Sequence, residues 1–253
     1  MLRVIKGVLL PIGLLLLWEA LWRGGFIIAD SMSHPSAIAQ AAKTSILDGS
    51  LLNATRETFG AALAGMALGA ALGICVGIAF GLSRALAGLM RLSTEVLRPI
   101  PSVALIPLAL LIYGFGFRME IAVVAFACFW PLLIITESAV RGIEPRLLEV
   151  SRALGFGILE RIGKIVLPAA LPRVFVGLRL AAAVALVVAV TVEITANPIG
   201  LGYALIVAQE SMKPDRMFVF LIWIGFLGWL LNAMLLRAQQ RWFGRMGNWA
   251  EQG

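Results

Sequence analysis

The stretch EVSRALGFGILERIGKIVLP, residues 149–168, mixes charged and apolar side chains in a chain that is otherwise strongly apolar. Its charged residues are Glu149, Arg152, Glu160, Arg161 and Lys164. An amphipathic segment of this kind either rests on lipid headgroups or docks in a groove of another protein. The composition of the flanking chain shows in which environment the segment lies.

The composition indicates a membrane protein. The chain has 253 residues, of which 60% are hydrophobic and 14% charged, and its mean hydropathy is +0.95. Soluble domains are about 45–50% apolar and about 25% charged. A helix needs about 20 mostly apolar residues to cross the roughly 30 Å hydrocarbon layer. Six runs meet this length: about 7–23, 58–82, 99–117, 119–139, 174–193 and 217–236. We therefore predict an all-α polytopic membrane protein with six transmembrane helices in a single domain, residues 1–253.

The net charge of +7 is explained by topology. With a cytoplasmic N-terminus and six spans, 15 of the 21 Lys and Arg residues face the cytoplasm, as the positive-inside rule requires. Both termini are then cytoplasmic, so Glu251 lies inside and Asp48 outside. The loop 140–173 is also cytoplasmic, and no nucleic-acid partner is needed to explain the basicity. The first run shows no small-residue cleavage pattern, so we expect a retained span.

The connections between the runs carry turn signals. Outside, Pro35 is expected to open a surface helix that Gly49 ends. A turn at 197–202 is expected before a second surface helix. Residues 83–98 and 114–118 are expected to form short turns, and Pro99, Pro101 and Pro107 interrupt the third run. Cys75 and Cys128 lie within runs, so no structural disulfide is expected.

Glycines in the second run repeat every four residues. Gly65, Gly69, Gly73 and Gly77 form one smooth face of a helix, and Gly81 continues it. Small residues at this spacing let helix backbones approach closely in lipid. The stripe fits packing within one subunit better than a subunit interface, although both use the same chemistry.

Catalytic and metal-binding motifs are not found. The single histidine, His34, and two separated cysteines do not make a usual zinc site. A phosphate loop needs Gly-x-x-x-x-Gly-Lys-Ser/Thr. At Gly163-Lys164 this pattern fails, because Ile158 and Ile165 occupy the required Gly and Ser/Thr positions. A membrane enzyme is therefore disfavoured, and any ATP hydrolysis must come from another polypeptide.

The loop 140–173 has the pattern of two short helices around a glycine break. Pro145 can start a helix that places Leu147, Leu148, Ser151 and Leu154 on one side. Gly155 and Gly157 interrupt it around Phe156, and a second helix follows, with Pro168 and Pro172 closing the loop. The pattern alone fits docking on a partner and resting on headgroups equally well.

The loop resembles the Glu-Ala-Ala loop of binding-protein-dependent ABC importer permeases. The matching residues are Glu149, Gly155, Ile165, Leu167 and Pro168, with Val150 and Ser151 in place of the two alanines. Other stretches are similar to the nitrate/sulfonate/taurine/bicarbonate branch of that family: RPIPSVALIPLALLIYGFG (98–116), GLRLA (177–181), Glu193 with GLG (200–202), Trp18-Glu19, and Arg56 with Gly60. Asn53 replaces a serine that is frequent in the branch.

The resemblance implies a type I importer permease-like bundle with a cytoplasmic coupling-helix loop. It implies a bacterial inner-membrane permease that works as a homodimer with two ATPase subunits and an external solute-binding protein. ATP and Mg would be bound by the ATPase and not by this chain. The residues implied to contact the ATPase are Glu149, Ser151, Leu154, Gly155, Phe156, Leu167 and Pro168. A small anionic solute would enter by alternating access, and the alternative is an ATP-independent channel or carrier, which needs no such loop.

Polar residues inside spans are candidates for the pathway or its gate, because they are costly in lipid. The candidates are Glu193, Thr191, Asn197, Ser102 and Arg179. Glu193 fits a gate or an anchor of the external loop better than direct contact with an anion. Arg179 can extend to the cytoplasm, or else pair with Glu137 or a carbonyl near an inner gate. Glu19 and Glu137 are expected to be solvated or paired.

Overall fold

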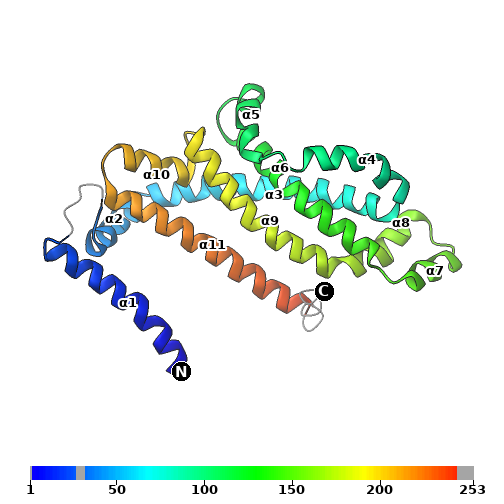
Figure 1. Cartoon of the computed structure of the whole chain (residues 1–253), viewed down its shortest axis with the longest axis horizontal. Coiled ribbons are helices and arrows are strands. Elements are labelled where there is room, and N and C mark those ends of the chain that lie inside the picture. Colours follow the sequence, from blue (N-terminus) through cyan, green and yellow to red (C-terminus); the bar gives the residue numbers. More distant parts are fainter. Residues whose placement is uncertain (1, 27–31, 244–253) are drawn as a thin grey trace.

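The computed structural model describes residues 2–26 and 32–243, and this part of the chain is built of helices without strands (Figure 1). Glu251, the marker of the C-terminal end, lies outside the described residues. The elements are α1 (Leu2–Arg23), α2 (Pro35–Leu47), α3 (Ser50–Leu82), α4 (Arg84–Leu97), η1 (Ser102–Leu105), α5 (Ile106–Tyr113), α6 (Phe117–Arg141), α7 (Pro145–Ala153), α8 (Ile158–Arg161), η2 (Ile162–Val166), α9 (Leu167–Thr195), α10 (Gly200–Glu210) and α11 (Pro214–Phe243).

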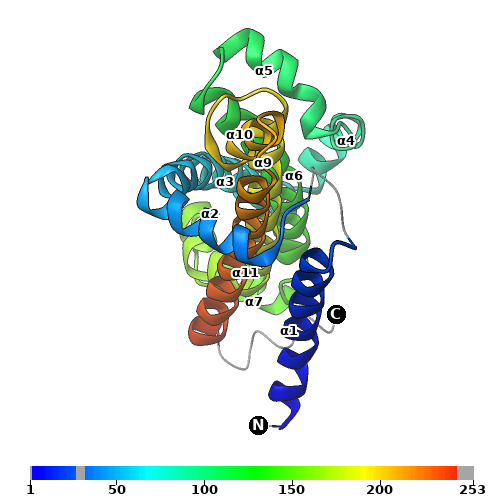
Figure 2. The same ribbon diagram turned by 90° about the vertical axis from the view of Figure 1, so that its left-hand side faces the viewer.

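Four helices in the described chain are long and apolar enough to cross a membrane: α3, α6, the continuous helix Ile158–Thr195, and α11. They run side by side along the long axis of the molecule (Figure 1). The broken pair formed by α4 and the segment Ser102–Tyr113 adds a fifth candidate. These helices confirm an all-α polytopic fold. Helix α1 has 22 residues and diverges from the bundle (Figure 2), and its passage through the membrane stays a prediction.

Residues 99–117, the third predicted span, do not form one straight helix. After α4 the chain turns, forms the short 3-10 element η1, and continues into α5, which has only eight residues. The two parts of this broken pair meet at 84°. Pro99 and Pro101 lie in the break, where a proline cannot supply the backbone N–H that a continuing helix needs. Gly114 and Gly116, with φ of 69° and 113°, end α5 and lead into α6.

Residues 83–98 were expected to be a short turn, and this prediction was wrong. Helix α4 fills the segment with 14 residues and has no buried residue. Ser83 caps its N-terminus by accepting a hydrogen bond from the Leu86 N–H at 3.2 Å. Leu89 and Leu92 are exposed, while Arg91 pairs with Glu95 one turn further on. The helix is amphipathic, and apolar run length alone could not detect it.

The glycine stripe of α3 lies against α6 of the same chain. A methyl group at Gly73 would lie 2.7 Å from the Phe129 carbonyl oxygen, and one at Gly77 would lie 2.7 Å from that of Leu133. At Gly65 it would meet Val124 at 2.6 Å, and at Gly69 it would collide with the Ala125 carbonyl. The two backbones therefore approach as closely as small-residue packing allows, which orients α6 on α3.

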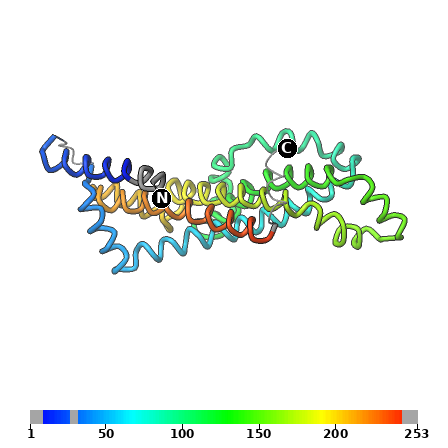
Figure 3. Tube along the Cα trace, turned by 90° about the horizontal axis from the view of Figure 1, so that it is seen from below, coloured from blue at the N-terminus to red at the C-terminus, as the bar shows by residue number. Residues whose placement is uncertain are grey.

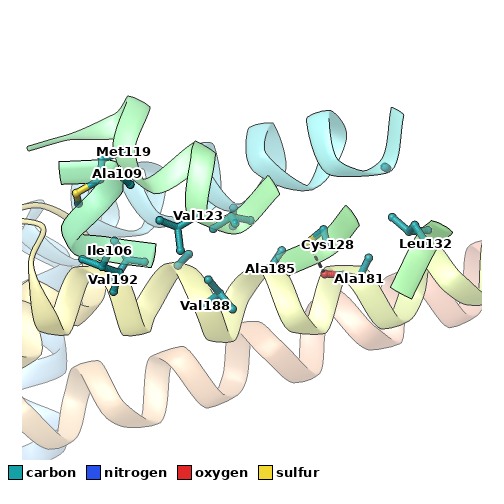
Figure 4. Packing of buried hydrophobic residues seen from close by; sticks show 14 residues of the cluster. Ile106, Ala109, Met119, Val123, Cys128, Leu132, Ala181, Ala185, Val188 and Val192 are labelled. Carbon is teal, nitrogen blue, oxygen red and sulfur yellow. Dashed lines mark hydrogen bonds between the residues drawn. The ribbon is translucent and has the colours of Figure 1, made fainter. Parts of the chain in front are cut away.

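The central core lies where α3, α5, α6 and α9 meet (Figure 4). Alanine and valine of α9 face larger side chains of α6, so the helices pack closely. Cys128 of α6 is buried and its thiol lies 3.4 Å from the Ala181 carbonyl oxygen, and both cysteines are free. This core holds the spans together between two more polar ends of the bundle.

One of those ends is covered by α2 and α10. Gly49, with φ of 77°, follows α2 and turns the chain into α3. Asp48 accepts a hydrogen bond from the Ser50 N–H at 2.9 Å and lies 3.8 Å from Arg216. These contacts, the Ser50 hydrogen bonds foremost, lower the pKa of the Asp48 carboxyl. Helix α10 was expected to lie on the surface, yet Leu201 is completely buried, so α10 is part of the packed bundle.

Candidate functional site

The loop that was predicted to couple to an ATPase lies at the opposite end of the long axis. Helix α7 and the turn after it project beyond the ends of α3 and α6 (Figures 1 and 3). The base of the loop is fixed by a small core that contains Ile143, Val166 and Ala170, with Leu148 of α7 packed against it. A rigid base and a projecting tip suit a segment that transmits force to or from a partner.

The turn at the tip has a defined glycine geometry. Gly155 has φ of 69°, and its N–H donates to the Arg152 carbonyl at 3.0 Å. The Phe156 N–H donates to the Ser151 carbonyl at 3.0 Å, which completes a Schellman motif at the end of α7. An ideal Cβ on Gly155 would meet no atom within 4 Å. Glycine is therefore required here by the backbone angle and not by space in this chain.

Apolar side chains of the loop face away from the bundle. Leu154 is 63% exposed, Ile158 66% and Leu159 80%, while Leu147 and Val150 are exposed to a smaller extent. Leu147, Leu148, Ser151 and Leu154 were expected on one side, but they divide between two. Leu148 packs inward, and the buried Ser151 donates its hydroxyl to the Leu148 carbonyl at 2.6 Å.

The remaining predicted loop residues flank this apolar tip. Glu149 is exposed on α7, and Phe156 is half-buried beneath Lys164, whose ammonium lies 4.8 Å from the ring centroid. Leu167 and Pro168 begin α9 and are exposed. Pro168 and Pro172 were expected to close the loop before the fifth span. Instead, α8, η2 and α9 form one continuous helix of 38 residues, because Pro168 lies in the first turn of α9 and a π turn precedes it.

Glu193 and Asn197 lie together at the other end of α9, roughly 40 Å from Leu167 at 1.5 Å per residue. Both are buried, with 2% and 1% of their surface exposed. Glu193 Oε2 accepts a hydrogen bond from the Gly202 N–H at 2.8 Å. Asn197 Oδ1 accepts from the Gly116 N–H at 2.9 Å, and its Nδ2 donates to Glu120 Oε2 at 2.7 Å. Asn197 therefore joins the end of α9 to the start of α6.

Two carboxyl groups of this polar cluster were not predicted. Glu120, in the first turn of α6, is completely buried and contacts Glu193. Glu57 of α3 is exposed and accepts a hydrogen bond from the Gly200 N–H at 2.9 Å, and its neighbour Thr58 accepts one from Leu201. Glu120 lies one residue inside the predicted start of a span, and that position resembles a solvated end. No local feature of the sequence marks Glu120, because its partner Glu193 is 73 positions away and only the fold brings the two together.

Three other predicted pathway residues are not part of the cluster. Thr191 donates its hydroxyl to the Val187 carbonyl in its own helix at 2.7 Å, and Ser102 begins η1. Arg179 lies 3.5 Å from the Gln239 side-chain oxygen of α11. Glu137 pairs with Arg141 at 2.7 Å, so the proposed Arg179–Glu137 pair is not formed. Glu19 pairs with Arg23 at 2.8 Å, as expected for a residue near a span end.

The helical bundle, with its small-residue packing and its projecting loop, is that of a polytopic membrane protein. The family model described as "Binding-protein-dependent transport system inner membrane component" matches residues 69–246. The chain belongs to this family, so it is an ABC importer permease subunit and not an enzyme, and the ATPase is a separate subunit.

Relatives over most of the length support the sulfonate/nitrate branch. A putative aliphatic sulfonates transport permease protein of Bacillus subtilis is 31% identical over 230 residues, 91% of this chain and 83% of the relative. A protein of the same name from Escherichia coli is 31% identical over 233 residues, 92% of this chain and 89% of the relative. An inward-facing structure of the MetNI methionine ABC transporter shares the fold, with a TM-score of 0.65 and 21% identity over 73% of this chain and 92% of the matched chain.

Proposed function

We propose that this chain carries a small aliphatic sulfonate into the cytoplasm as the permease of an ATP-driven importer. The observation that carries the ATP-driven part is the loop around Gly155. Its exposed apolar tip stands clear of the bundle and its base is packed into it. A surface of this kind buries apolar area when it is seated in a groove. Closure of an ATPase dimer around two such loops would move the spans attached to them.

The substrate class rests on similarity along the whole chain. The two sulfonate permeases match more than nine-tenths of this chain at 31% identity. The bundle is compatible with such a solute, because its two buried carboxylic side chains are engaged inside the fold: Glu193 accepts from the Gly202 N–H and Glu120 from the Asn197 side-chain amide. Because both are buried, neither carboxyl group is exposed where a sulfonate would contact it. Nitrate and taurine are small anionic or zwitterionic solutes of similar size and are the next candidates.

In the proposed assembly two copies of this chain form the pathway. Two ATPase subunits bind ATP and Mg on the cytoplasmic side, and a solute-binding protein delivers the substrate from outside. The loop 140–173 and both termini are cytoplasmic. The transport cycle is alternating access, in which ATP and its hydrolysis shift the populations of outward-open and inward-open states.

The proposal is tested by transport in vesicles that contain this permease, its ATPase and its binding protein. Labelled taurine should enter only when ATP is supplied on the ATPase side, and unlabelled ethanesulfonate should compete with it. The permease alone should neither hydrolyse ATP nor accumulate taurine. Uptake without the ATPase would instead establish a channel or carrier. ATP-driven uptake of nitrate without uptake of either sulfonate would replace the substrate class and keep the transport mechanism.

A further inference from the structure

The buried carboxyl groups of Glu120 and Glu193 lie where transport by the proposed route does not require them. Glu120 comes from the first turn of α6 and Glu193 from the last turn of α9. The two side chains are 0% and 2% exposed, and their carboxyl groups face each other within hydrogen-bonding range. A pair of acids in contact at this depth needs either a cation or a proton between them.

The described residues provide no cation. Neither carboxyl group forms an ion pair with an Arg, Lys or His in this part of the chain, and no group of acidic, His or Cys side chains there is suited to hold a metal ion. Arg56 and Arg118 are close in sequence to Glu57 and Glu120, yet neither forms an ion pair with the cluster. Glu57 of α3, the other titratable group that acts on the pair, adds negative charge.

Hydrogen bonding leaves one position open on each carboxyl group. Oε2 of Glu120 accepts from Asn197 and Oε2 of Glu193 accepts from Gly202. Oε1 of each is buried and receives no N–H or O–H donor. The Thr58 hydroxyl faces Glu193, but it lies 3.1 Å from the Ala54 carbonyl, to which it donates. Two unpartnered oxygens in one buried site are satisfied together when a single proton lies between them.

We propose that Glu120 and Glu193 bind one proton between them and that this proton closes a clamp joining α6, α9 and α10. The clamp runs from Asn197 through Glu120 and Glu193 to Gly202, and the chain segment 193–202 completes the ring. With the proton present, the two acids form a hydrogen bond and the three helices move as one body. Removal of the proton leaves two like charges in contact and opens the junction.

The orientation of Asn197 supports this arrangement. Its Oδ1 must accept from Gly116, because a backbone N–H can only donate. Nδ2 is therefore fixed as the donor to Glu120 Oε2, and the proton of Glu120 is directed to Oε1 and Glu193. Gly200, with φ of 88°, brings its backbone against the Glu193 carboxyl group so closely that a Cβ would collide with it. The Gly200 backbone thus restricts where the Glu193 carboxyl group can lie.

The sign of the pH effect follows from the shared proton. The clamp is complete at neutral and acidic pH and is lost as alkaline pH removes the proton, so stability should fall on that side. Glu120→Gln should replace the proton with an amide: its oxygen accepts from Asn197 and its nitrogen donates to Glu193. This variant should keep the clamp and lose its alkaline sensitivity. Glu57→Gln is the matched control, since it neutralises an exposed carboxylate of the same cluster.

The test is infrared spectroscopy of the purified full-length chain in deuterated buffer, combined with thermal unfolding from neutral to alkaline pH. The wild type should show the carbonyl band of a protonated carboxylic acid, which disappears on alkalinisation together with part of the thermal stability. Glu120→Gln and Glu193→Gln should both lack the band, and Glu57→Gln should keep it. The proposal is overturned if the wild type has no such band at neutral pH, or if Glu120→Gln loses stability at alkaline pH as the wild type does.

Discussion

Asn197 Nδ2 lies 2.7 Å from Glu120 Oε2, and this hydrogen bond ties the turn after α9 to the first turn of α6 across 77 positions of sequence. The same amide accepts from Gly116 on its other side. One buried side chain therefore organises the end of the bundle opposite the loop 140–173, and its replacement tests how much the fold depends on this polar cluster.

Asn197→Asp should destabilise the protein strongly. The substitution removes the N–H that Glu120 accepts and adds a third buried carboxyl group beside Glu120 and Glu193, which form no ion pair within the described residues. Uncompensated charge in such a site costs about 3–5 kcal/mol of unfolding free energy. Thermal unfolding in detergent measures the loss. Asn53→Asp, the same change at an exposed position of α3, should shift stability by no more than about 0.5 kcal/mol. Equal stability of the two variants would contradict a structural role for Asn197.

Gly69→Ala tests the close approach of α3 and α6. Its methyl group would collide with the Ala125 carbonyl and lie 3.0 Å from the Cys128 Cβ. Two backbones must separate to admit it, which is expected to cost about 1–3 kcal/mol. Gly88→Ala in α4 is the control, because a Cβ there meets nothing within 4 Å and alanine favours a helix by about 1 kcal/mol. Unfolding temperatures should therefore move in opposite directions, and a neutral Gly69→Ala would show that the interface is looser than the distances indicate.

The membrane orientation is tested by cysteine labelling of intact cells after Cys75 and Cys128 are replaced. Asp48→Cys should react with an impermeant reagent added outside, because Asp48 lies in the turn between α2 and α3 and is partly exposed. Leu159→Cys at the exposed tip of the loop, and Glu251→Cys near the C-terminus, should react only after the membrane is opened. Labelling of position 159 from outside would reverse the topology and remove the coupling loop from the side of the ATPase.

Apolar runs and glycine spacing predicted much of the fold, because lipid imposes simple rules on sequence. A helix must be long and apolar, and closely packed helices need small residues. The same rules failed at residues 83–117. Helix α4 is amphipathic and was expected to be a turn, and α5 is too short to span although it lies in the predicted span 99–117. Run length also missed the bend of 84° between these two parts. Proline marked the break but did not reveal the direction in which the chain continues.

The two candidate sites differed in predictability for a physical reason. The loop is local: Gly155, the end of α7 and the exposed tip lie within 15 residues, so sequence pattern could specify the turn. The polar cluster is assembled from α3, α6, α9 and α10, which only the packed bundle brings together. Glu193 and Asn197 were identified as intramembrane polar residues, but the partner Glu120 stood 73 positions before Glu193 at the edge of a different span. Pairing over that separation has no local signature.

Gly155→Val tests the proposal that the loop 140–173 couples this chain to an ATPase. At φ of 69° a side chain with a Cβ is strained by about 1–2 kcal/mol, and valine, being β-branched, is among the residues that avoid this region most. A Cβ at this position meets no atom of the described residues within 4 Å, so the spans should insert and fold. The Schellman turn should rearrange, and the exposed Leu154 and Ile158 should lose their register on the ATPase. We expect loss of co-purification with the ATPase, or loss of substrate-dependent ATP hydrolysis in vesicles. Glu149→Ala should show a milder form of the same defect.

Gly157→Ala is the control for Gly155→Val. Gly157 is two residues away, has an ordinary φ of −62°, and has open space around its Cβ position, so this variant should behave as the wild type. If Gly155→Val binds the ATPase and couples hydrolysis to uptake as the wild type does, the loop only rests on lipid headgroups and force must reach the spans elsewhere.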